Sequence, residues 1–195
     1  MLKEKKISRK KQIELTATEL FMSRGYAATS MRDLATALGI EAASLYSHIK
    51  SKEEILQKIC FRMAEEFFAA IKDIEGKALS AEQKLIAAVH AHLDVITKDT
   101  AASAVFFNEW RHLSEPFLGD FLRMREEYEQ HFIEIIKLGI TNGEFQPIDH
   151  KFGMLTIISS LNWVHNWYKP QGKMSIDEIK HELSSTLIEG LKHKK

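Results

Sequence analysis

Side chains that can bind phosphate gather in one short part of the N-terminal quarter of the sequence. Hydroxyl, imidazole and ammonium groups follow one another closely there, in Tyr46, Ser47, His48, Lys50 and Lys52. Thr29 adds a further hydroxyl upstream. Groups of these types donate hydrogen bonds to phosphate oxygens when a protein contacts DNA. We therefore expect this region to meet a polyanion.

The distribution of charge supports the same expectation. The chain has no formal net charge, yet residues 1–52 hold 10 Lys and Arg against 5 Asp and Glu, whereas residues 53–195 hold 17 against 22. A basic segment joined to an acidic remainder favours a polyanionic partner at one end only. A solvated basic arm would give the same pattern, so charge alone leaves both interpretations open.

Catalytic and metal-binding patterns are weak in this sequence. Among the nine histidines, His90 and His92 are two residues apart and so point to different sides of a helix. Glu109 and His112 suit one helical turn, but a single such pair is commonly an ordinary surface pair. The sequence contains no HExxH zinc motif, nucleophile elbow or glycine-rich phosphate loop. We predict that the chain is not an enzyme and holds no metal or cofactor.

Cysteine usage and hydropathy bear on the compartment. Cys60 is the only cysteine, so neither a disulfide within the chain nor a cysteine-based zinc site can form, and its apolar neighbours predict a buried, unreactive thiol. Residues 1–12 are charged, and the longest apolar run, Met154–Val164, is too short to cross a bilayer. These features predict a cytoplasmic protein without a membrane partner.

The elements that must position these side chains are helices. Apolar residues recur at helical spacing, as in Ile13, Ala17, Leu20 and Phe21, and strand-like alternation is hard to find. Gly25 then supplies a left-handed residue of the kind that ends a helix. We therefore predict an all-α fold of about nine helices.

Two short helices follow this first one. Ser30 can cap the second helix with the help of Asp33, and Gly39 ends it. The third helix is expected over about 42–48, and the small side chain of Ala35 allows the two helices to approach closely. Such a pair could be a helix-turn-helix, in which the second helix enters the major groove of DNA. It could equally be a structural corner.

The remaining helices are placed by capping signals and breaks. Ser51 with Glu54 forms a capping box that opens the fourth helix. Further helices are predicted over about 81–97, 100–113, 116–142, 150–168 and 175–192.

A dense set of ordered residues distinguishes the N-terminal region: Phe21, Gly25, Tyr26, Thr29, Ala35, Gly39, Leu45, Tyr46, His48 and Lys52 through Leu56. With these positions, the tracts LFMSRGYAATSMRDLATALGI and SLYSHIKSKEEIL resemble the tetracycline-repressor (TetR) family of bacterial regulators. The resemblance implies a helix-turn-helix protein that binds palindromic double-stranded operator DNA as a dimer. It implies a DNA-binding domain over 1–52, inside a TetR-type region of about 8–68 that includes a linker helix. Residues 53–195 would form a ligand-binding and dimerisation domain.

The resemblance also assigns roles to single residues. Positions that match Thr29, Tyr46, His48 and Lys52 contact phosphates in such proteins. Positions that match Ala42, Ala43, Ser44 and Ser47 face base edges, and Arg32 is a further candidate for base contact. Because two of the base-facing residues are alanines, readout would depend on serine hydroxyls and on contacts with thymine methyl groups.

Apolar residues in the last two predicted helices suit an interface between two copies of the chain. A continuous stripe lies at Ile176, Ile179, Leu183, Leu187 and Leu191, and Met154–Val164 is apolar on nearly all sides. A core within one chain would give the same patterns. The resemblance implies a homodimer formed through about 150–168 and 175–192.

Aromatic side chains with a few polar groups are concentrated over 106–132 and 161–168, a composition that suits an apolar ligand cavity as well as an ordinary core. The run WxxxWYxPxG at 163–172, preceded by the turn Gly143–Phe145, resembles a TetR subgroup that responds to acyl-CoA thioesters and controls the degradation of fatty acids, aromatic acids or sterols. It implies an effector site formed by Phe106, Trp110, Arg111, Arg123, Tyr128, Phe132, Asn162, Trp163, Asn166 and Trp167. A regulator of xenobiotic efflux and a DNA-binding dimer without a ligand are the alternatives.

Overall fold

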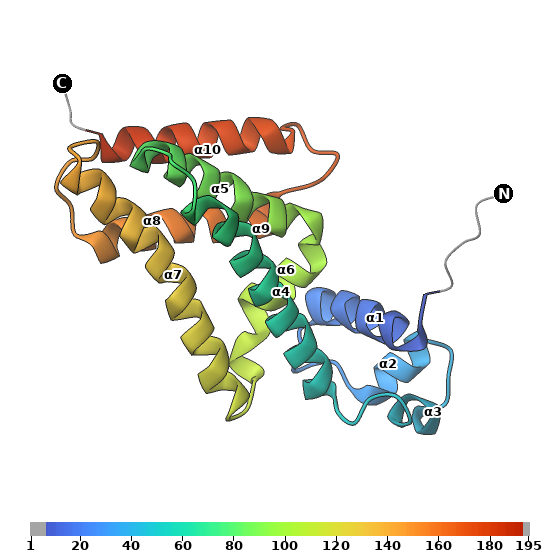
Figure 1. Cartoon of the computed structure of the whole chain (residues 1–195). Coiled ribbons are helices and arrows are strands. Elements are labelled where there is room, and N and C mark those ends of the chain that lie inside the picture. Colours follow the sequence, from blue (N-terminus) through green and yellow to red (C-terminus); the bar gives the residue numbers. More distant parts are fainter. Residues whose placement is uncertain (1–6, 193–195) are drawn as a thin grey trace.

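The computed structural model describes residues 7–192, and within this range all regular structure is helical (Figure 1). The elements are α1 (Arg9–Arg24), α2 (Met31–Ala37), α3 (Ala42–Tyr46), α4 (Lys52–Glu75), α5 (Ala81–Lys98), α6 (Thr100–Glu109), η1 (Trp110–His112), α7 (Phe117–Thr141), α8 (His150–Asn162), α9 (Val164–Trp167) and α10 (Ile176–Leu191). The predicted all-α fold is confirmed. The ends of the chain, residues 1–6 of the basic segment and 193–195, lie outside the described range.

Two predicted helices are each divided in the structure. The helix expected over 100–113 ends at Glu109 and continues as a single 3-10 turn, η1. The helix expected over 150–168 ends at Asn162, because the ring Nδ1 of His165 donates a hydrogen bond to the Asn162 carbonyl while the amide of Asn166 bonds to Trp163 instead. The break after α8 therefore comes from local competition for the last carbonyls of that helix.

The predicted caps of the head are present. The hydroxyl of Ser30 accepts a hydrogen bond from the amide of Asp33, whose carboxylate accepts one from the Ser30 amide. After α2, Gly39 has φ +64°, and the amide of Ile40 bonds to the carbonyl of Ala35 at 3.0 Å. A residue with a Cβ is disfavoured at this φ, so Gly39 permits the sharp turn between α2 and α3.

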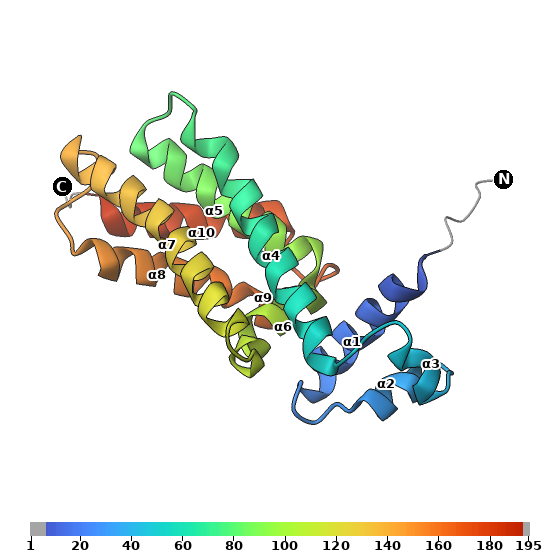
Figure 2. The ribbon, with the colours of Figure 1, turned by 60° about the horizontal axis from the view of Figure 1, so that its bottom comes forward.

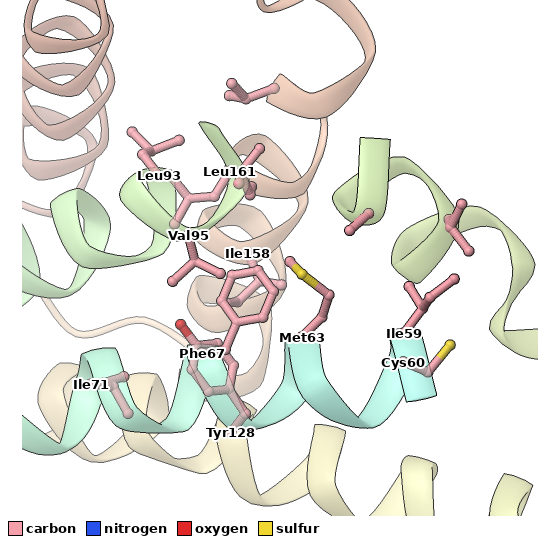
Figure 3. Close-up of a cluster of buried hydrophobic side chains, with 14 of the residues drawn as sticks. Ile59, Cys60, Met63, Phe67, Ile71, Leu93, Val95, Tyr128, Ile158 and Leu161 are labelled. Atoms are coloured by element: carbon pink, nitrogen blue, oxygen red, sulfur yellow. The ribbon is translucent and has the colours of Figure 1, made fainter. Parts of the chain in front are cut away.

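The helices form two parts joined by α4 (Figure 1). We call α1–α3 the head and α5–α10 the body. The long helix α4 begins beside α3 and runs into the body, where it packs against α5, α6 and α7 (Figures 1 and 2). Its buried side chains include Ile59, Met63 and Phe67, which point into the body core (Figure 3). A movement of α4 would therefore change contacts in both the head and the body.

The turn Gly143–Phe145 fixes the far end of the body. The Glu144 carboxylate accepts hydrogen bonds from the amides of Ala81 and Glu82, at 3.1 and 3.0 Å, and so caps the start of α5. The ring of Phe145 is buried against Gly139 of α7, at a place where a Cβ would overlap it. This turn thus ties α5, α7 and the start of α8 together. Among the described helices, none is long and apolar enough to cross a membrane.

Candidate nucleic-acid interface and internal cavity

The outer face of α3 is the exposed surface of the head that sequence analysis singled out. Ala43, Ser44 and Ser47 are exposed and Ala42 is half-buried, whereas Leu45 is fully buried against the head core. The Ser47 hydroxyl donates to the Ser44 carbonyl at 2.7 Å. Its proton is then used within the helix, so the hydroxyl of Ser44 is the better placed donor of the two.

Other predicted DNA contacts surround this face. Tyr46 is 54% exposed, Arg32 is exposed on α2, and His48 is half-buried just after α3. A phenol, a guanidinium and an imidazole thus border the small residues of α3. This is the arrangement of groups that a helix inserted in a groove needs at its edges, where the phosphates lie.

The polar groups of Thr29 and Lys52, which were also predicted to contact phosphates, make hydrogen bonds within the protein. The buried hydroxyl of Thr29 donates to the carbonyl of Gly25 at 2.9 Å. The ammonium of Lys52 donates to the carbonyls of Tyr26 and Thr29, each at 2.7 Å, and lies 4.2 Å from the centre of the Tyr26 ring. Both side chains hold the α1–α2 loop, and Lys52 ties it to the start of α4. Sequence patterns could not reveal the partners of Lys52, which are more than 20 residues away in the chain.

Aromatic and polar contacts connect the head to the body. The ring of Tyr26 stacks on His112 of η1 with centroids 5.1 Å apart, and the amide of Ser114 donates to the Glu53 carboxylate at 2.8 Å. Burial, with a smaller effect from Glu53, raises the pKa of Tyr26 to about 12, so this phenol stays neutral. The uncharged Tyr26–His112 stack thus links the head to η1, and the Ser114–Glu53 hydrogen bond links the segment after η1 to the start of α4.

Arg62 of α4 makes a second connection. Its guanidinium lies 3.4 Å from the carboxylate of Glu14 in α1, 3.3 Å from Asp99 and 2.9 Å from Glu66. One cation therefore joins the first helix of the head, the linker helix α4 and the junction between α5 and α6.

A cavity of about 130 Å³, partly open to solvent, lies between α4, α5, α6, η1, α7 and α8. Seven aromatic side chains line it: Phe67, Phe68, Phe106, Phe107, Trp110, Phe121 and Tyr128. The other lining residues are Ala64, His92, Met124, Arg125, Glu129, Ile158 and Asn162. Figure 3 shows Phe67 of α4 beside Tyr128 of α7, and their ring centroids are 5.6 Å apart. An aromatic cavity with a few polar groups is the usual form of a small-molecule site.

The structure places four of the predicted effector residues in this lining: Phe106, Trp110, Tyr128 and Asn162. The other six lie elsewhere. Arg111 stacks over Trp110, Arg123 is exposed and paired with Asp120, and Phe132 is fully buried beside Tyr128. Trp163, Asn166 and Trp167 are exposed around the turn between α8 and α9, whereas Val164 between them is buried.

His92 lines the cavity and was not among the predicted effector residues. It is buried, with its Nδ1 2.9 Å from the Tyr128 hydroxyl and its Nε2 3.1 Å from Oδ1 of Asn162. Burial lowers the pKa of His92 to about 3, so its ring is neutral. A neutral ring that donates from Nε2 to Asn162 must accept at Nδ1 from the Tyr128 hydroxyl. Its spacing of four from buried Ala88 and Ile96 was the available signal that His92 faces inward.

A charged pair borders the cavity on α7. Nε of Arg125 lies 3.4 Å from the Glu129 carboxylate, and the Arg125 guanidinium lies 5.2 Å from the centre of the Trp110 ring. Because Arg125 is exposed, this pair marks the solvent side of the site, whereas His92 and Tyr128 mark the buried side.

The outer face of α8 is apolar and uncovered in the single chain. Phe152 is 69% exposed, Trp163 is 64% exposed, and Leu155 between them is also exposed. The α10 stripe differs, since Ile179 and Leu191 are buried within the chain, where α10 packs mainly on α5. The apolar face of α10 is therefore largely buried within its own chain, whereas the apolar face of α8 stays exposed to solvent.

These features define a class of protein: a helix-turn-helix head that carries an exposed reading helix, joined by a long helix to an all-helical body with an internal cavity. Residues 78–191 match the family model described as Tetracyclin repressor-like, C-terminal domain, and residues 15–59 match the model of bacterial regulatory proteins of the tetR family. The chain belongs to the TetR family of DNA-binding transcription regulators. This confirms the predicted family, and with it the prediction that the chain is not an enzyme.

Named relatives agree with the family along the whole chain. The HTH-type transcriptional repressor KstR2 of Mycolicibacterium smegmatis is 28% identical over 186 residues, which cover 94% of this chain and 91% of that protein. The structure of the ketosteroid transcriptional regulator KstR2 of Mycobacterium tuberculosis superposes with a TM-score of 0.89 at 24% identity, over 96% of both chains. The structure of AibR in complex with isovaleryl coenzyme A and operator DNA gives a TM-score of 0.80 at 22% identity, over 94% of this chain and 98% of that one.

Proposed function

We propose that this chain is a transcriptional repressor that binds palindromic operator DNA as a homodimer and releases it when a small apolar effector, an acyl-CoA thioester, occupies the body cavity. The observation that carries the proposal is the position of the cavity. Its wall includes Trp110, whose 3-10 turn also holds His112 against the head, and Phe67 of the linker helix α4.

DNA binding in this proposal uses α3 as the reading helix. Ser44 and Ser47 meet base edges, Ala42 and Ala43 contact thymine methyl groups, and Arg32 reaches in from α2. Tyr46 and His48 contact phosphates at the edges of the groove. Thr29 and Lys52 contribute mainly by fixing the orientation of α2 and α4, since their polar groups are engaged inside the head. The DNA-binding domain then comprises residues 1–52, and 53–195 form the effector and dimerisation domain.

Dimerisation is proposed through α8 with the help of α10. Large apolar side chains exposed together on one helix, such as Phe152, Leu155 and Trp163, are costly in water and are typical of an interface. Leu183 and Leu187 of α10 are half-buried and would complete the contact. A dimer is needed because the two reading helices must enter successive major grooves, about 34 Å apart.

Release follows from linkage between the two sites. If the effector prefers a position of α4 and η1 in which the two reading helices are wrongly spaced, it weakens DNA binding by the same factor by which DNA weakens effector binding. The Tyr26–His112 stack and the Arg62 connections are the contacts through which such a shift would reach the head.

An acyl-CoA is the proposed effector for two reasons. The Trp163–Gly172 run resembles the acyl-CoA-responsive subgroup, and a structure with the same fold holds isovaleryl coenzyme A together with operator DNA. In this chain Arg111 and Arg125 both lie over the Trp110 ring, and Arg125 is at the solvent side of the cavity, where the phosphates of a coenzyme would emerge.

The test combines DNA selection with an effector panel. A bound sequence is first selected from random duplex DNA with the full chain, and its release is then followed by fluorescence anisotropy with acyl-CoAs, free acids and unrelated drugs. A ligand at a hundred times its dissociation constant should also stabilise the protein by about 2.7 kcal/mol. Selection of no duplex would refute the DNA-binding proposal. Release by drugs and not by thioesters would favour the efflux-type alternative, and release by nothing would favour a DNA-binding dimer without an effector.

A further inference from the structure

The hydrogen bonds around His92 leave one amide NH2 group of the cavity lining without a partner among the described residues. If Nε2–H of His92 donates to Oδ1 of Asn162, and the Tyr128 hydroxyl donates to Nδ1, both hydrogen bonds run in one direction, from Tyr128 to Asn162. The hydroxyl proton of Tyr128 and the Nε2 proton of His92 are then both engaged in these two hydrogen bonds. Nδ2 of Asn162 has no hydrogen-bond partner among the described residues, and Asn162 lines the cavity.

The charges of the lining restrict the ligand further. His92, Tyr128 and Asn162 are neutral, and within the described lining the ionised groups are Arg125 and Glu129, which pair with each other. A carboxylate at the buried end would meet one neutral amide NH2 group and aromatic carbon, and it would lose its hydration without a cation in return. A carbonyl oxygen needs only one N–H donor of this group.

The volume of the cavity sets the size of the apolar part. A cavity of about 150 Å³ lined by apolar side chains holds a molecule of the size of benzene, and the cavity here is about 130 Å³. It therefore accommodates about six non-hydrogen atoms, whereas a steroid skeleton or a long fatty chain would have to displace Phe67, Phe106 or Tyr128 from the core.

From these observations we infer that the effector is a thioester of a short, branched or single-ring acyl group, whose carbonyl oxygen accepts a hydrogen bond from Nδ2 of Asn162. This inference rests on the proposed function and narrows it. Asn162 is then a specificity-determining residue, and His92 with Tyr128 are positioning residues that hold its amide in one orientation.

Isothermal titration of the full chain in the absence of DNA tests the size limit. The probes are acetyl-, butyryl-, isovaleryl-, hexanoyl-, benzoyl- and decanoyl-CoA. Affinity should increase about fourfold for each methylene added while the acyl group still fits, and should fall beyond hexanoyl-CoA. An affinity that continues to rise through decanoyl-CoA would overturn the inference and leave the proposed function intact. If no thioester binds while the chain still binds DNA, the proposal of an acyl-CoA effector is itself refuted.

The carbonyl contact is tested on the ligand and on the protein. S-butyl-CoA, which lacks the carbonyl, should bind the native chain roughly tenfold more weakly than butyryl-CoA, a difference of about 1.4 kcal/mol. Asn162→Leu should lose the same factor for butyryl-CoA and show no further loss with S-butyl-CoA. Asn166→Leu is the matched control, since Asn166 is exposed and lies outside the cavity lining, and it should bind as the native chain does. Equal affinities for the two ligands, or equal effects of the two variants, would refute the contact.

Discussion

The buried histidine of the cavity predicts how stability depends on pH. His92 is neutral in the folded chain with a pKa of about 3, against an ordinary value of 6.5 when it is exposed on unfolding. Between these two values the unfolded chain binds a proton that the folded chain does not. Stability from this group is therefore complete above about pH 6.5 and is lost as the pH falls towards 3.

The expected size of the effect follows from the same two values. Lowering the pH from 7 to 5 should reduce the free energy of unfolding by about 2 kcal/mol through His92 alone. His92→Gln keeps polar groups near Tyr128 and Asn162 but cannot take up this proton. A lower stability of the variant at pH 7 does not affect the prediction, which concerns the change in the free energy of unfolding between the two pH values.

Urea unfolding at one fixed protein concentration provides the measurement, with the native chain and His92→Gln compared at pH 7 and pH 5. The native chain should lose about 2 kcal/mol more than the variant over this interval. His181→Gln removes an exposed imidazole and should keep the native difference. If the native chain and His92→Gln lose the same free energy of unfolding, the buried neutral imidazole does not cause the pH dependence. The direction assigned to the hydrogen bonds from Tyr128 through His92 to Asn162 would then be unsupported.

Three further predictions concern the head, the body and the dimer. Lys52→Met removes two hydrogen bonds from an ammonium to the α1–α2 loop. Thermal unfolding should show a loss of about 2 kcal/mol in stability, and anisotropy should show weaker binding to all DNA sequences alike. Unchanged stability would mean that the Lys52 contacts are unimportant. Gly139→Ala forces the buried ring of Phe145 aside and should lower the free energy of unfolding in urea by about 1–3 kcal/mol. Gly119→Ala on the same helix meets only the flexible end of Glu115 and should be nearly neutral. Equal losses of stability in the two variants would contradict the packing argument. Phe152→Glu places a charge on the exposed face of α8 and should yield monomers in analytical ultracentrifugation, while a dimer as tight as the native one would exclude α8 from the interface.

Sequence reasoning succeeded where the determinants are local. The capping box of Ser30 and Asp33, the turn at Gly39 and the buried position of Cys60 depend on neighbours within a few residues, or on an apolar stretch of one helix. Burial also raises the pKa of Cys60 to about 12, in agreement with the unreactive thiol that was predicted.

It failed where a side chain's partner comes from another part of the chain. Periodicity shows that one face of α5 is apolar, but it does not show that His92 on that face meets Tyr128 and Asn162. The predicted continuous helix over 150–168 put Trp163 at the effector site, and a single hydrogen bond from the His165 ring to the Asn162 carbonyl was enough to break that helix. Asn162, the last residue of α8, lines the cavity, whereas Trp163 one position later still bonds to the Ser159 carbonyl and is exposed.

The central claim is that occupancy of the body cavity controls DNA binding by the head. It is tested most directly by two titrations: the affinity of the full chain for its selected operator with and without saturating isovaleryl-CoA, and the affinity for isovaleryl-CoA with and without saturating operator. The account predicts that both affinities fall by one common factor, in the range of about 5 to 150. Thioester binding that leaves the affinity for DNA unchanged would contradict it.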